Sequence, residues 1–261
     1  MEQTVEDLRN MFNLKGQVAV VTGGAGALGS AMALGMAAYG ANVVVTGRTL
    51  STLETTVSEL EKLGVESLAV ACDTSKKEDV ENLVKATMAM FGKIDILVTA
   101  AGIAKRFPAE DFPVEDFDQV MDVNVKGTFL CCQAVGRVMK EQGGGKIITV
   151  SSVRAFAGHP GGYAAYGTSK GAINALTKQL ATEWAKYNIN VNSIAPTILW
   201  TPLTQPVLED EKLKQIFLSR IPMGRPAKTD DMVGSTVFLA SAASDFITGQ
   251  ILYVDGGCTA G

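Results

Sequence analysis

The sequence is poor in side chains that bind metals or form disulfides. It has a single histidine, His159, and four cysteines without a CxxC spacing, which excludes a zinc site of the usual kind and predicts no bound metal. The cysteines are therefore predicted to be reduced, buried thiols in a reducing compartment. They are Cys72, Cys131, Cys132 and Cys258.

Excess basic charge and long apolar runs are also lacking. Lys and Arg number 23 against 27 Asp and Glu, a net charge of -4, so nothing attracts a nucleic acid or an anionic membrane surface. No stretch suits a bilayer span, and the start of the chain, MEQTVEDLRN, carries acids instead of the apolar core of a secretory signal. We therefore expect a cytoplasmic protein whose partner is a small molecule.

Short β-branched segments alternate with helix-length segments along the chain. Because the strand-like segments are nearly continuously apolar, they are predicted to be buried on both faces, as in a parallel sheet. The predicted strands are 17–22, 42–47, 66–71, 94–99, 146–151, 188–195 and 251–255. The predicted helices are 28–39, 50–63, 77–91, 115–141, 164–186 and 229–243, several followed by a C-capping glycine.

This pattern predicts one α/β domain over residues 1–261, a doubly wound, Rossmann-type fold with about seven parallel strands and helices on both faces. Residues 1–14 would form an N-terminal extension. Segment 196–228 breaks the alternation, with five prolines and one short amphipathic piece near 207–219. Such an excursion is typical of a loop over a substrate site, and a plain surface connection is the alternative.

A glycine-rich turn, TGGAGALG, joins the first strand to the first helix at residues 22–29. Glycines let the backbone approach a phosphate closely, and the helix N-terminus offers free N–H groups to it. Placed at the start of a repeating βα chain, the turn predicts a dinucleotide site. Its candidate residues are Gly23, Ala25, Ala27, Leu28 and Gly29.

The end of the second strand bears on the choice of cofactor. An acid there would bind the ribose 2′-hydroxyl of NAD, but the chain has Arg48, which favours the 2′-phosphate of NADP(H). NAD(H) stays possible if Arg48 is a solvated loop residue. After the third strand, Asp73 and the adjacent Thr74 lie where adenine is expected, and capping of helix 77–91 is the alternative role for Asp73.

Tyr166 and Lys170 share a face of the predicted helix 164–186. A lysine close to a phenol is expected to lower the pKa of the phenol, which would then exchange a proton with an alcohol or ketone. Ser152, at the end of the fifth strand, would hydrogen-bond the substrate oxygen. Asn124, within helix 115–141, is either part of a polar helix face or holds a water that relays protons to Lys170.

With these motifs in their order, the chain resembles the classical short-chain dehydrogenase/reductase family over residues 15–257. The resemblance implies a catalytic tetrad of Asn124, Ser152, Tyr166 and Lys170, and a homotetramer built on the helices 115–141 and 164–186. It also implies that Lys170 binds the nicotinamide ribose and Thr201 the carboxamide. The further cofactor residues it implies are Ala101, Gly102, Pro196 and Ile198, with Tyr166 itself.

The sequence departs from the family pattern at four places. Ala27 replaces the middle glycine of the turn. Thr99-Ala100-Ala101-Gly102 replaces the usual Asn-Asn-Ala-Gly, so a strand-stabilising asparagine is missing. Thr197 replaces the glycine that follows Pro196. Ser152 precedes Tyr166 by 14 positions rather than the commoner 13, which adds one residue to the loop 153–163.

Within the family, the chain is most similar to gluconate 5-dehydrogenase-like sugar-acid and polyol dehydrogenases. The basic side chains of Lys105, Arg106, Arg154 and His159 fit that resemblance, because they would suit a carboxylate. Trp200 is a further candidate. The alternative is that the basic residues are solvated or bind cofactor phosphate. The apolar side chains of Leu199, Trp200, Leu203 and Phe217 would equally suit a steroid, a terpenoid or an aromatic ketone.

Two other functions fit the same residues less well. A 3-oxoacyl-carrier-protein reductase would need a basic surface for the acidic carrier, against the acidic balance of this chain. A nucleotide-sensing regulator without turnover would be expected to have lost Tyr166 or Lys170, and both are present.

Overall fold

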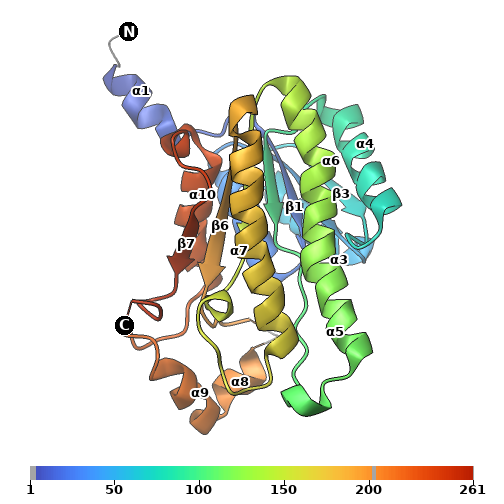
Figure 1. Ribbon diagram of the computed structural model, residues 1–261. Coiled ribbons are helices and arrows are strands. Elements are labelled where there is room, and N and C mark those ends of the chain that lie inside the picture. The colour runs from blue at the N-terminus through green and yellow to red at the C-terminus, as the bar shows by residue number, and fades with distance from the viewer. Residues whose placement is uncertain (1–3, 202–203, 261) are drawn as a thin grey trace.

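The computed structural model describes residues 4–201 and 204–260. In these residues the core is a seven-stranded parallel sheet with the order β3-β2-β1-β4-β5-β6-β7 (Figure 1). Every predicted strand is confirmed to within two residues, as is the fold class. The strands are β1 (Val18–Thr22), β2 (Asn42–Gly47), β3 (Ser67–Ala71), β4 (Ile96–Thr99), β5 (Gly145–Val150), β6 (Ile189–Pro196) and β7 (Ile251–Val254).

Two apolar layers cover the two faces of the sheet. Successive side chains of a strand point to opposite faces, so Ala19 and Val21 of β1 join one layer while Val20 joins the other. The first layer lies under α2 (Ala27–Ala38), α3 (Leu50–Glu61) and α10 (Val233–Ala240). The second lies under α4 (Lys77–Phe91), α6 (Gly127–Gln142) and α7 (Ala164–Trp184), and Figure 1 shows α6 and α7 in front of the sheet.

The predicted single helix 115–141 is wrong in one respect. It consists of α5 (Val114–Met121), a five-residue π-helix η3 (Asp122–Lys126) and α6. The Gly127 N–H donates to Asp122 O, five residues back, so the turn holds one extra residue. Asn124 is buried inside this wide turn. Such turns concentrate at functional sites, and hydrophobic periodicity alone does not detect one.

Two other helical predictions also need correction at their ends. Segment 229–243 consists of a 3₁₀ turn η6 (Thr229–Met232), α10 and a second 3₁₀ turn η7 (Ala242–Ser244). Helix 164–186 passes at Ala185 into the 3₁₀ turn η5 (Ala185–Tyr187). Helices commonly tighten in this way at their ends, where the last carbonyl groups lack α-helical partners.

The excursion 196–228 carries two helices where one amphipathic piece was predicted. They are α8 (Gln205–Glu209) and α9 (Glu211–Leu218). Asp210 separates them, because its carboxylate accepts from the N–H groups of Lys212 and Leu213 and so caps α9. Leu203, a candidate for apolar cover, lies outside the described residues.

The N-terminal extension is partly helical, with α1 (Val5–Arg9) followed by the 3₁₀ turn η1 (Asn10–Phe12). Figure 1 shows α1 projecting away from the sheet. The chain joins the core at Leu14, which is fully buried and whose N–H donates to Tyr39 O at 2.9 Å.

The structure also bears on the expected lack of membrane spans and on the cysteines. Among the described residues, no helix has the length and apolar character needed to cross a membrane. The cysteines are free, and burial raises the pKa of the Cys132 thiol to about 12. Cys258 is only half-buried, because it lies in the turn after the edge strand β7, so the prediction of four buried thiols is wrong for that residue.

Candidate active site

The strand order reverses between β1 and β4, and this reversal positions a crevice. Strands β2 and β3 lie on one side of β1, whereas β4 to β7 lie on the other. Ligands of open α/β sheets bind beyond the carboxyl ends of the strands at such a switch point. A cavity of about 340 Å³ lies here, lined by residues that follow β1, β4, β5 and β6 and by residues of α7.

The glycine turn between β1 and α2 packs closely against the residues that follow β4. Gly23 has φ 66°, and a Cβ there would lie 2.8 Å from Ala101 N. A Cβ on Gly29 would lie 2.3 Å from Gly23 O. Gly26 is the N-cap of α2 and brings no capping side chain, so the first N–H groups of the helix face the crevice without one. This arrangement suits the phosphates of a dinucleotide.

The segment at the carboxyl end of β4 lacks the strand-stabilising asparagine that is common in the family. Thr99 Oγ1 is buried and has no hydrogen-bond partner among the described residues, so the replacement does not recreate a polar contact. Instead, Thr22 Oγ1 of β1 accepts from Ala101 N at 3.1 Å. Two adjacent strands are thereby joined at the point where the turn meets them.

Arg48 and Asp73 follow β2 and β3, where the adenosine of the cofactor is expected. Arg48 is exposed after β2, close enough to Asp73 to help lower the pKa of that carboxyl group. The main cause is the Ser75 hydroxyl, which donates to Asp73 Oδ1 at 2.7 Å. Asp73 therefore does not cap α4, whose N-cap is Lys76. The neighbouring Thr74 is buried against Gly127, the first residue of α6.

Tyr166 and Lys170 project from the N-terminal part of α7. Lys170 is buried, its Nζ donates to Val150 O at 2.7 Å, and burial lowers its pKa to about 8. Nζ lies 5.6 Å from the centre of the Tyr166 ring. Burial raises the pKa of Tyr166, and a hydrogen bond with the Ser152 hydroxyl opposes that rise. The direction is opposite to the one expected from the lysine alone, because desolvation is the largest effect.

Ser152 ends the segment after β5 and caps a 3₁₀ turn, η4 (Val153–Ala155). Its Oγ accepts from Arg154 N at 3.2 Å. Ser152 is buried and lines the cavity with Tyr166 and Lys170. The extra residue in the loop 153–163 therefore leaves the serine and the tyrosine together.

Asn124 makes no hydrogen bond to Lys170 in the described part of the chain. Its Oδ1 accepts from Ile103 N at 2.8 Å, while its Nδ2 donates to Ile103 O at 2.9 Å and to Ser169 Oγ at 3.0 Å. These contacts join the π-helix to the segment after β4 and to α7. Both Nδ2 hydrogens are used by protein groups, whereas Oδ1 keeps a second lone pair, so the role of Asn124 in holding a relay water stays a prediction.

The other expected cofactor residues divide into two groups. Leu28, Gly102, Ile198 and Thr201 line the cavity beside the catalytic candidates. Ala25, Ala27, Ala101 and Pro196 lie in the adjoining backbone: the first two in the β1–α2 connection, Ala101 after β4, and Pro196 at the end of β6.

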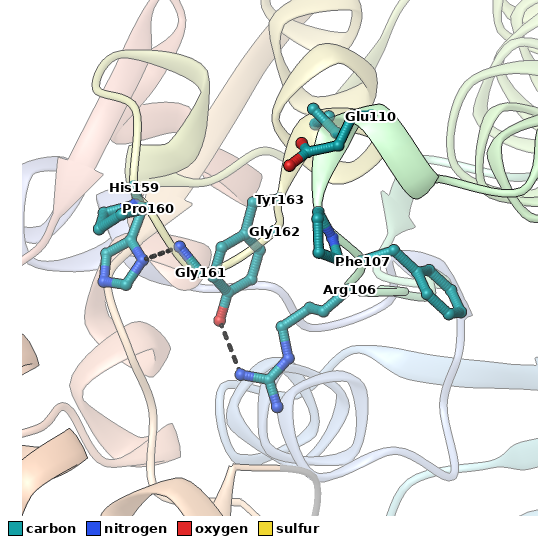
Figure 2. Close-up of a pocket in the computed structure, with 11 residues that line it drawn as sticks. Arg106, Phe107, Glu110, His159, Pro160, Gly161, Gly162 and Tyr163 are labelled. Atoms are coloured by element: carbon teal, nitrogen blue, oxygen red, sulfur yellow. Dashed lines mark hydrogen bonds between the residues drawn. The ribbon is translucent and has the colours of Figure 1, made fainter.

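The expected substrate residues are only partly brought together. Arg106 and Arg154 line the cavity, and His159 lines a neighbouring cavity of about 610 Å³ that shares Arg106 and Tyr163 with it (Figure 2). Lys105 forms an ion pair with Asp116, so its positive charge is already neutralised by a protein carboxylate. Trp200 is 46% exposed and lines neither cavity. Sequence reasoning missed Tyr163 and Val207, which line the first cavity, and Arg220, whose Nη1 donates to Gly158 O; no motif gave a signal for them.

Comparisons with known proteins agree over nearly the whole chain. Residues 23–259 match the family model described as enoyl-(acyl carrier protein) reductase. The chain is 38% identical to gluconate 5-dehydrogenase of Gluconobacter oxydans (strain 621H), over 96% of this chain and 97% of that one.

Two solved structures show the same fold. One is a gluconate 5-dehydrogenase from Burkholderia cenocepacia J2315 in complex with NADP and tartrate, with TM-score 0.93, 36% identity, and coverage of 97% and 98%. The other, a short-chain type dehydrogenase/reductase from Mycobacterium marinum, has TM-score 0.90, 33% identity, and coverage of 97% and 99%. The glycine turn, the serine–tyrosine–lysine grouping and these similarities together establish that the chain belongs to the short-chain dehydrogenase/reductase family of oxidoreductases.

Proposed function

We propose that the protein oxidises or reduces a sugar acid, moving a hydride between the substrate's CH–OH carbon and NADP(H). The observation that carries this proposal is one cavity in which Ser152, Tyr166 and Lys170 meet the guanidinium-bearing residues Arg106 and Arg154. The first three suit proton transfer at a hydroxyl, and the two arginines suit a carboxylate. The similarity to gluconate 5-dehydrogenases supports the same substrate class.

The crevice fits a dinucleotide. A Cβ would clash with backbone at Gly23 and at Gly29, so the turn has the narrow form that lets a pyrophosphate approach the N-terminus of α2. When bound, the nicotinamide supplies the hydride donor or acceptor. Arg48 would hold the 2′-phosphate, which favours NADP(H), and a similar structure contains NADP. NAD(H) stays the alternative cofactor.

In this proposal Tyr166 is the general acid and base. During oxidation its phenolate takes the hydroxyl proton as hydride leaves the adjacent carbon, and during reduction the phenol returns it. Ser152 donates to the substrate oxygen and also hydrogen-bonds the phenol. Lys170 would hold the ribose of the cofactor and stabilise the phenolate. Asn124 acts as a positioning residue, through Ile103 and Ser169.

The excursion 196–228 would cover the substrate, since Leu199, Val207 and Phe217 line the cavity. We also propose a cytoplasmic homotetramer in which α6 and α7 meet their symmetry mates, as the family resemblance implies.

The proposal is tested by mixing the purified protein with NADP⁺ and either D-gluconate or the neutral polyol sorbitol, and following NADPH absorbance. We expect oxidation of the sugar acid with a clear preference over the polyol, and faster turnover with NADP⁺ than with NAD⁺. Efficient reduction of neutral aromatic ketones together with no turnover of any sugar acid would overturn the substrate class.

A further inference from the structure

Three guanidinium groups converge beside the active-site cavity. Arg154 Nη1 and Arg220 Nη1 both donate to Gly158 O, at 3.4 Å and 3.2 Å. Arg106 donates to Tyr163 OH at 3.4 Å, with its guanidinium 5.7 Å from the centre of that ring. Among residues 4–201 and 204–260, none of the three arginines has a carboxylate partner within ion-pair distance.

His159 lies among these arginines in a fixed orientation. Its ring stacks on Phe217 at 4.7 Å and 17°, and packs edge-on against Tyr163 at 5.4 Å. Nδ1 accepts from Gly161 N at 3.1 Å, a contact visible in Figure 2. The proton of the neutral ring therefore resides on Nε2. Nε2 is buried and has no hydrogen-bond partner in the described part of the chain.

These features leave His159 Nε2 and several guanidinium N–H groups without an acceptor among the described protein groups. A buried N–H without a partner destabilises the protein, and neighbouring like charges repel. Each arginine uses one of its donors in the contacts above and keeps others available. Glu110, which lines the neighbouring cavity, is exposed. A bound anion would satisfy Nε2 and neutralise the guanidinium groups together.

The cluster is continuous with the reacting end of the cavity. Arg154 and Phe217 line the cavity that holds Ser152 and Tyr166, while His159 lines the neighbouring one. Arg220 comes from the turn after α9, so the excursion supplies one of the cations. The position of the cluster thus suits the far end of a short substrate whose reacting carbon lies at Tyr166.

We propose that Arg154, Arg220 and His159 form a subsite that binds the carboxylate of the substrate, with its reacting hydroxyl against Ser152 and Tyr166. This inference rests on the proposed function and adds the residues that select an acid over a neutral polyol. Arg106, held on Tyr163 between the two cavities, borders the subsite.

Kinetics test the arginines. Arg220→Gln and Arg154→Gln should each raise the KM for D-gluconate about tenfold, equivalent to about 1.4 kcal/mol, with little change in the KM for NADP⁺. Arg220→Gln should also leave kcat nearly unchanged, whereas Arg154→Gln removes a charge that helps to lower the pKa of Tyr166 and should reduce kcat as well. Lys85→Gln is the control, because it removes a positive charge from an exposed position on α4. If the KM for gluconate is the same in the two arginine variants as in the control variant, the subsite is wrong. Arg220 is exposed, so Arg220→Gln is expected to fold.

The single histidine allows a second test that does not depend on turnover. One imidazole signal is expected in the NMR spectrum of the labelled protein, and its titration reports His159 alone. Burial first, and then the charges of Arg154, Arg220 and Arg106, lower the pKa of His159 in the free protein. D-gluconate and tartrate should raise that pKa, sorbitol should not, and Arg220→Gln should weaken the response.

The outcomes separate the two proposals. If gluconate is turned over but leaves the His159 pKa unchanged at saturation, the subsite is wrong and the function stands. If tartrate and gluconate raise the pKa but no sugar acid is turned over, the subsite stands as an anion site and the proposed reaction is wrong.

Discussion

At the scale of single residues, burial acts on Lys170 and Tyr166 in opposite senses. It lowers the pKa of the lysine to about 8 and raises the pKa of the tyrosine. Both shifts favour the neutral form, because charge is costly away from water. The phenolate that the proposed reaction needs is therefore stabilised by specific contacts, of which the hydrogen bond with Ser152 is one.

Replacing the tyrosine separates chemistry from binding. Tyr166→Phe should lower kcat by about 10²- to 10⁴-fold, the usual contribution of a general acid–base group, while the Kd for NADPH changes little. Steady-state kinetics and NADPH fluorescence titration measure the two quantities. Tyr39→Phe, on the exposed side of the molecule, is the control. Retention of most of the activity in Tyr166→Phe would remove this residue from its proposed role.

The pKa of Lys170 predicts a pH dependence of stability. Since the group is deprotonated in the folded protein above about pH 8 but stays charged in the unfolded chain to about 10.5, the unfolded state binds more protons in this window. Below pH 8 Lys170 is charged in both states, and burial of that charge destabilises the folded protein. Stability relative to the variant Lys170→Met should therefore rise between pH 8 and 10, by at most about 1.4 kcal/mol per pH unit.

Urea unfolding of both proteins over this range measures the difference. A difference that falls with rising pH would contradict the assigned burial of the charge.

Arg48 should decide the preference for NADP(H). Arg48→Gln removes the proposed charge-assisted contact to the 2′-phosphate, so the Kd for NADPH should rise about tenfold or more while the Kd for NADH stays the same. Thermal shift and fluorescence titration provide both values. Lys62→Gln, an exposed position on the C-cap of α3, is the control. Equal weakening of both cofactors would instead indicate a change in the fold of the β2 end.

At the scale of elements, the junction of β1 and α2 tolerates little added volume. Gly29→Ala would place a methyl group 2.3 Å from Gly23 O, so the turn must open, and we expect at least tenfold weaker NADPH binding and a lower Tm. Gly234→Ala in α10 is the matched control. No heavy atom lies within 4 Å of its added Cβ, so it should stabilise the protein by about 0.5–1 kcal/mol.

If Gly29→Ala binds NADPH normally, the narrow turn does not hold the cofactor. Isothermal titration of both variants with NADPH, and their thermal unfolding, give the comparison.

The elements were predictable where each residue's own preference agreed with the fold. The segment VVVT in β2 is β-branched and buried on both faces, so it is identified from the sequence. The π-helix around Asn124 was not predictable, since its apolar spacing fits an ordinary helix. The contact of Arg220 with Gly158 was not predictable either, because the two residues are far apart in the sequence. The pairing of Lys105 with Asp116 likewise depends on tertiary contacts.

The whole molecule should not depend on its first helix. The structured core begins at the buried Leu14, while α1 projects from it. Deletion of residues 2–11 should therefore leave Tm nearly unchanged, whereas Leu14→Ala should cost about 2–5 kcal/mol by leaving a cavity. Thermal unfolding at equal protein concentration measures both. A large loss of Tm on deletion would show that α1 is packed in solution, for example against another subunit.

The parallel arrangement of the described strands has a consequence for how the chain folds. Among the described strands, sequential strands are connected through helices and not by hairpins. Because β1 pairs with β4, the two halves of the sheet can join only after β4 has been formed. Closing such long loops is slow, so refolding is expected in milliseconds to seconds or longer. Strands β1, β2 and β3 leave the ribosome first and are neighbours in the sheet. The half that is expected to bind adenosine can thus form during synthesis, before the half with Ser152, Tyr166 and Lys170 has folded.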